Sequence, residues 1–115
     1  MRVIVCGSRA GIDTALVRST LTQLHALQRI TCLVHGCASG VDSDASLWAR
    51  EHDVPEDPHP AAWTRYGRRA GPLRNEEMAS RGADLCIAIH RGTKGTQDMM
   101  KRAKAHGIIV REVRV

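Results

Sequence analysis

Three short apolar runs constrain this chain most, because each ends in a glycine-containing corner and is followed by a helical pattern. The runs are Val3 to Cys6, Ile30 to Val34 and Leu85 to Ile89. Apolar runs that alternate with helical segments are typical of parallel strands covered by helices. The carboxyl ends of parallel strands lie at one edge of a sheet, so the three corners should meet there and form a ligand crevice.

The other elements follow from helical spacing and from helix-breaking residues. Val17, Leu21 and Leu24 recur at helical spacing and predict a helix from about Asp13 to Leu27, capped by Asp13 or Thr14. The further predictions are a helix from about Val41, a proline-rich edge strand and loop over 54–62, an arginine-rich loop over 63–74, helices over 73–81 and from 96, and a last strand over 108–113.

The resulting order predicts an α/β fold, a three-layer Rossmann-like parallel sheet of about five strands with helices on both faces. A length of 115 residues suits one domain, so residues 1–115 are expected to form a single Rossmann-like domain. No apolar run reaches the ~18 residues of a membrane span, and the first residues lack the pattern of a signal peptide. We therefore expect a cytoplasmic protein without a membrane partner.

Charge and composition narrow the class of partner. A net charge of +5 and a pI of about 9.5 favour an anionic ligand. Aromatic residues make up only 3% of the chain, which leaves no repeated basic-aromatic platform for stacking successive bases. Nucleic acid is therefore a less favoured partner than a small nucleotide. Cys32, His35 and Cys37 lack a further ligand cluster, so we expect no metal, and the cysteines are predicted to be reduced thiols.

The corners and helix starts supply the candidate ligand-binding residues. An arginine fork suits phosphate, free amides at a helix start bind anions, and an acidic side chain can accept hydrogen bonds from ribose. The candidates are Gly7, Ser8 and Arg9 in the first corner, Gly36, Ser39, Gly40 and Asp42 in the second, Arg74 and Asn75 on the predicted helix over 73–81, and Gly92, Lys94, Gly95 and Thr96 in the third corner.

Each candidate also has a structural alternative. The glycines could serve only the turns, Thr96 could be a plain helix cap, and Arg74 could form a surface pair with Glu77. Asp42 in a first helical turn is favourable through the helix dipole alone.

The aromatic and imidazole side chains are expected to be mainly structural. Trp63 and Tyr66 could stack on a base, but a core position is the favoured interpretation for Trp63, and Trp48 is predicted to be core. His35 and His90 end strands near the crevice, where either could act as an acid or base.

Four motifs together resemble the YspA-related group of the SLOG superfamily, Rossmann-like proteins that include the LOG proteins and DprA. The motifs are the opening Val-Ile-Val-Cys-Gly-Ser-Arg, His35 to Asp42, Ala70 to Met78 and Gly92 to Met99. The resemblance implies a site for a nucleotide or a nucleotide-derived ligand, in a sensor, a sequestering protein or a processing protein.

LOG-type relatives hydrolyse the N-glycosidic bond of nucleoside monophosphates with a Pro-Gly-Gly-x-Gly-Thr-x-x-Glu motif. Aligning its Gly-Thr with Gly95-Thr96 places Met99 at the glutamate position, with Asp98 turned about 100° away on the helix. This departure favours ligand binding over catalysis. The alternatives are hydrolysis of an N-glycosidic or phosphate bond, with Asp42 or Asp98 as weak catalytic candidates, and binding of single-stranded DNA as in DprA. No cofactor is expected, and so small a chain is expected to form a homo-oligomer.

Overall fold

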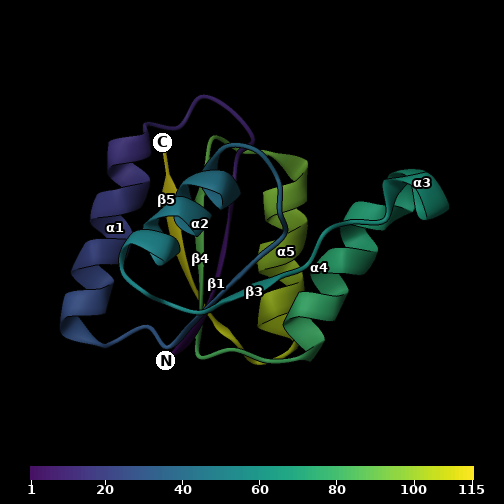
Figure 1. Ribbon diagram of the computed structural model, residues 1–115. Helices are drawn as coiled ribbons and strands as arrows, with labels where there is room; N and C mark the ends of the chain where they lie inside the picture. The colour runs from purple at the N-terminus through teal and green to yellow at the C-terminus, as the bar shows by residue number, and fades with distance from the viewer.

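The strands alternate their apolar side chains between two faces, and this alternation builds the layers of the protein. A computed structural model describes residues 1–115 and shows one parallel sheet between two helical layers (Figure 1). The strands are β1 (Arg2–Gly7), β2 (Cys32–His35), β3 (Glu56–Pro58), β4 (Leu85–His90) and β5 (Ile109–Arg114), in the order β3-β2-β1-β4-β5. The predicted three-layer Rossmann-like fold is confirmed.

Helices cover both faces of this sheet and divide the core in two. They are α1 (Thr14–Leu27), α2 (Val41–Glu51), α3 (Trp63–Tyr66), α4 (Ala70–Ser80) and α5 (Lys94–Ala105), with a 3₁₀ turn η1 (Gly67–Arg69). Val3 and Val5 of β1 face the core under α1 and α2, whereas Ile4 and Cys6 face the core under α4 and α5. Trp48 is fully buried in the first core, as predicted. Each helix is too short or too polar to cross a lipid bilayer.

The helix starts differ in part from their predicted positions. Asp13 caps α1, and its carboxylate accepts a hydrogen bond from the Ala15 amide at 2.9 Å, as predicted. The alternative interpretation of Thr96 as a helix cap is wrong, because α5 begins at Lys94 with Thr93 as its N-cap. Thr96 therefore lies inside the first turn of α5, where it is buried.

The segment predicted as a loop over 63–74 is largely helical. It contains α3, η1 and the first turn of α4, which begins before Pro72 because amides in a first helical turn need no intrahelical acceptor. Neither α3 nor η1 buries a residue, and α3 projects away from the sheet (Figure 1). The predicted core position of Trp63 is wrong, because its side chain is 46% exposed.

The strand order fixes where a crevice can form. From β1 the chain passes to β2 and β3 on one side, and then returns to β4 and β5 on the other. Connections leave β1 and β4 toward opposite faces, so a gap opens at the carboxyl ends of these two strands. The first and third corners follow these two strands.

The substitution Gly7→Ala tests how closely the ends of β1 and β4 pack against the start of α2. A Cβ at Gly7 would lie 2.1 Å from the Ile89 carbonyl oxygen and 2.6 Å from Val41 Cγ2, so Gly7→Ala should lower the free energy of unfolding by about 2 to 3 kcal/mol. Gly95→Ala is the matched control, because a Cβ at Gly95 meets nothing within 4 Å. Urea denaturation of both variants makes the comparison, and equal losses would contradict the close packing at Gly7.

Candidate functional site

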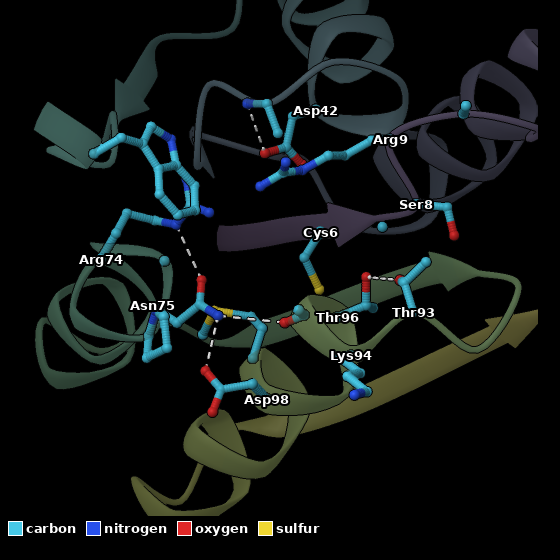
Figure 2. Close-up of a pocket in the computed structure, with 18 residues that line it drawn as sticks. Cys6, Ser8, Arg9, Asp42, Arg74, Asn75, Thr93, Lys94, Thr96 and Asp98 are labelled. Atoms are coloured by element: carbon cyan, nitrogen blue, oxygen red, sulfur yellow. Dashed lines mark hydrogen bonds between the residues drawn. The ribbon is translucent and has the colours of Figure 1, made fainter. Parts of the chain in front are cut away.

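A cavity of about 600 Å³ lies at the carboxyl ends of β1 and β4 (Figure 2). Most of the sequence candidates line it together: Gly7, Ser8, Arg9, Asp42, Arg74, Asn75, Lys94, Gly95 and Thr96. Gly36 and Ser39 line a smaller neighbouring cavity, whereas Gly40 and Gly92 line neither. A volume of this size is typical of small-molecule sites.

Ser8 joins the three corners through its backbone. The Ser8 amide donates to the Ile89 carbonyl at 3.1 Å, and its carbonyl accepts from the Val41 amide at 3.2 Å. The Ser8 hydroxyl accepts from the Arg91 amide at 3.0 Å and so holds the β4–α5 loop. Gly40 is needed beside this corner, because its φ is +74° and a Cβ there would lie 2.4 Å from the Ser8 carbonyl oxygen.

The first turn of α5 forms one wall of the cavity with its amides uncapped. Thr93 makes no side-chain bond to these amides, and its hydroxyl donates instead to the Thr96 hydroxyl at 2.8 Å. The first turn carries no acidic residue, and it begins with Lys94. Free amides, the positive end of the helix dipole and a lysine together make an anion-binding wall.

Arg74 forms the opposite wall and is held by two backbone carbonyls and one side-chain oxygen. Its Nε donates to Asn75 Oδ1 at 3.0 Å, and its Nη1 donates to the carbonyls of Gly36 and His59. Its Nη2 has no protein partner. Burial lowers the pKa of Arg74, while the Asp42 carboxylate opposes this shift. The alternative pairing with Glu77 does not occur, so Arg74 presents a positioned donor toward the cavity.

Asp42 supplies a buried carboxylate at the start of α2. It is 6% exposed, and one oxygen, Oδ2, accepts from the amides of Gly36 at 3.0 Å and Ala38 at 3.2 Å. The second oxygen has no protein partner. Burial raises the pKa of Asp42, opposed by these amides and by the charges of His35 and Arg74. The geometry leaves one oxygen able to accept a hydrogen bond from a ligand hydroxyl.

A second carboxylate, Asp98, lies in the same cavity beside Met99. Asp98 Oδ2 accepts from Asn75 Nδ2 and from Arg102 Nε, each at 2.9 Å. Its other oxygen has no protein partner. The cavity therefore contains a positioned carboxylate one residue before the position that the LOG motif would give to glutamate (Figure 2).

His35 and His90, which end β2 and β4, do not line the main cavity, and both make the same pattern of hydrogen bonds. Nδ1 of His35 accepts from the Cys37 amide at 3.1 Å, and Nδ1 of His90 accepts from the Gly92 amide at 2.9 Å. Their Nε2 atoms contact Glu56 on β3 and Glu112 on β5. Because both nitrogens of each ring are engaged, the geometry supports structural roles.

Sequence reasoning missed Cys6, which lines the cavity below the first corner. The hydrogen bond with the Cys86 thiol, 3.9 Å between sulfur atoms, and then burial raise the pKa of Cys6 well above its ordinary value. Cys6 is therefore a protonated, apolar part of the site. Its place as the last side chain before a strand-end glycine is the signal that could have identified it. No three His, Cys, Asp or Glu side chains cluster as metal ligands, and all four cysteines are free thiols.

The sheet order and the cavity between its central strands define a Rossmann-like α/β protein with a ligand site at the point where the connections diverge. Residues 1–66 match the family described as YspA, cpYpsA-related SLOG family (YAcAr), and the chain belongs to this family. The chain is 38% identical over 116 residues to the Gene 61 protein of Mycobacterium phage D29, an alignment that covers 95% of this chain and 93% of that relative. No solved structure matches the chain.

Asp42→Asn separates the charge of this carboxyl from its hydrogen bonds. The amide oxygen of asparagine can keep both backbone bonds, because one Asp42 oxygen now accepts both. Burial raises the folded-state pKa, so the stability of wild type relative to the variant should be greatest below the ordinary aspartate pKa of 3.8 and should fall as pH rises through the raised value. Urea denaturation of both proteins at a series of pH values measures this difference in stability. A relative stability that grows with pH would show that the folded state favours the carboxylate.

Proposed function

We propose that this protein binds a nucleotide or a nucleotide-derived small ligand in the cavity at the ends of β1 and β4. The phosphate lies on the first turn of α5 beside Lys94, and the ribose lies near Asp42. Membership of the SLOG family supports a nucleotide-related ligand. The cavity volume of about 600 Å³ suits a ligand of this size.

The observation that carries this proposal is the composition of the α5 start. Lysine in a first turn opposes the helix dipole, and glycine costs about 0.5–1 kcal/mol relative to alanine inside a helix. Gly95 has no structural need to be glycine, because it lacks a positive φ and a Cβ there meets nothing within 4 Å. Lys94 and Gly95 both disfavour the helix, and both favour an anion close to its amides.

The charged groups that line the cavity differ from one part of it to another. Asp42 repels phosphate and accepts hydrogen bonds, so it suits the hydroxyl groups of a sugar. Lys94 and the α5 amides lie across the cavity from Arg74 (Figure 2). A ligand with one anionic end and one hydroxyl-bearing end matches this distribution.

Gly95→Asp tests the anion site by moving stability and binding in opposite directions. A carboxylate in the first turn of α5 should stabilise the helix by about 0.3–1 kcal/mol through the dipole. The same carboxylate should repel phosphate and weaken the binding of 5′-AMP at least tenfold, which corresponds to about 1.4 kcal/mol. Thermal unfolding and calorimetric titration with 5′-AMP measure the two effects.

Gln97→Glu is the control for this test. Gln97 lies in the same helix but does not line the cavity, so the variant adds a similar charge without blocking the site. Its affinity for 5′-AMP should stay within about twofold of wild type, since Gln97 is exposed and water weakens the interaction of its charge with the bound phosphate. Unchanged 5′-AMP affinity in Gly95→Asp would refute a phosphate position on α5.

Asp98 favours a second candidate function, hydrolysis of the N-glycosidic bond of the bound nucleotide. A carboxylate beside the sugar can stabilise an oxocarbenium-like centre while water adds to the sugar and the protonated base leaves. Arg102 and Asn75 hold one oxygen of Asp98, and the other is free to face a ligand. This activity remains secondary to binding, because Met99 occupies the position of the family glutamate.

Incubation of 5′-AMP with the protein, followed by chromatography for adenine, tests the second function. Asp98→Asn can keep both side-chain contacts through its amide oxygen, yet it should reduce adenine release at least a hundredfold, about 2.7 kcal/mol of transition-state stabilisation. Intact 5′-AMP after incubation with wild type would leave a protein that only binds its ligand. Equal release by both proteins would exclude Asp98 from the reaction.

A further inference from the structure

A second cavity of about 320 Å³ adjoins the main one. The two cavities share part of their lining: Arg9, Ala38, Trp63 and Arg74. Pro60 and Ala61 line only the second cavity. The volume lies at the lower end of the range for small-molecule sites and suits one further base or sugar.

The shared lining carries cationic donors without protein partners. The Arg9 guanidinium stacks 5.4 Å from the Trp63 ring centroid and makes no hydrogen bond or ion pair with the protein. Arg74 is fixed through Nε and Nη1, which leaves Nη2 free. Arg9 is an exposed residue, and Arg74 Nη2 is not among the buried polar atoms that lack a partner, so the free donors of both arginines are accessible to a ligand.

A free mononucleotide would not use these donors fully. The proposed phosphate position is on α5 beside Lys94, which lies across the main cavity from Arg74 (Figure 2). Two arginine donors between two cavities match an anionic group inside the ligand, with one part of the ligand on each side. Trp63 borders both cavities, so its indole can stack on a ring in the second one.

We propose that the ligand is a nucleotide joined through an internal phosphodiester to a second nucleoside. The internal phosphate lies between Arg9 and Arg74, and the second nucleoside occupies the smaller cavity against Trp63. This inference rests on the proposed nucleotide function and specifies its ligand class.

The dinucleotide pApA, compared with 5′-AMP by calorimetric titration, tests this inference. Wild type should bind pApA at least tenfold more tightly than 5′-AMP, because the second phosphate gains charge-assisted hydrogen bonds. Ala61→Phe places a large side chain in the second cavity only. This variant should lose the preference for pApA while its affinity for 5′-AMP stays within about twofold of wild type.

Two further variants control this experiment. Ala26→Phe makes the same substitution at an exposed site on α1, and it should keep the preference for pApA. Arg9→Ala removes an exposed side chain without protein hydrogen bonds, so it should fold even if Ala61→Phe does not. It should weaken pApA binding at least fivefold more than 5′-AMP binding, as loss of a charge-assisted contact predicts.

The outcomes distinguish a failure of the two-cavity ligand from a failure of the proposed nucleotide function. Equal affinities of wild type for 5′-AMP and pApA, or an unchanged preference in folded Ala61→Phe and Arg9→Ala, would overturn the two-cavity ligand alone. Failure to bind either compound would overturn the proposed nucleotide function as well. An oligonucleotide of about eight residues that binds far more tightly than pApA, with a steep salt dependence, would replace the compact ligand by a nucleic-acid strand.

Discussion

The rest of the structure depends on the hydrogen bonds that the backbone of Ser8 makes. Its amide bonds to Ile89 at the end of β4, and its carbonyl bonds to Val41 at the start of α2. β1 is the central strand, so this corner has the corners of both neighbouring strands within reach. Any larger residue at Gly7 or Gly40 would push these backbones apart. The close approach therefore fixes the cavity walls relative to one another.

The two helix starts at this junction differ in charge, and the difference gives the site its polarity. The first turn of α2 contains Asp42 and Asp44, whereas the first turn of α5 contains Lys94 and no acidic residue. The acidic residues of α2 stabilise its positive end, so that end is already compensated within the protein. The positive end of α5 is reinforced by Lys94 and gains compensation only from an anion. The proposed anion would therefore supply a stabilisation that the α5 sequence lacks.

The element order could be predicted because strand and helix periodicities are local, and the corners could be placed because strand ends in a parallel sheet coincide. The helical turns over 63–69 could not, because they bury no side chain and so leave no periodic signal. The role of each glycine was equally hidden. Gly7 is enclosed by the Ile89 carbonyl and the Val41 side chain, whereas Gly95 faces open space, yet in the sequence both are glycines of a corner that follows an apolar run. The bond from Arg74 to the Gly36 carbonyl spans 38 residues, a distance that no local pattern encodes.

The two carboxylates of the cavity are held in the same way, and this limits the ligands that fit. Asp42 and Asp98 each use Oδ2 for two protein donors, so their orientations are fixed before a ligand arrives. The same cavity is lined by three cationic side chains: Arg9, Arg74 and Lys94. Positive charge exceeds negative by only one in this lining, which suits a ligand that combines anionic groups with hydroxyl donors. An inorganic polyanion would meet two fixed carboxylates and lose much of this attraction. The proposed nucleotide carries both kinds of group, because its phosphate and its sugar hydroxyls are separate.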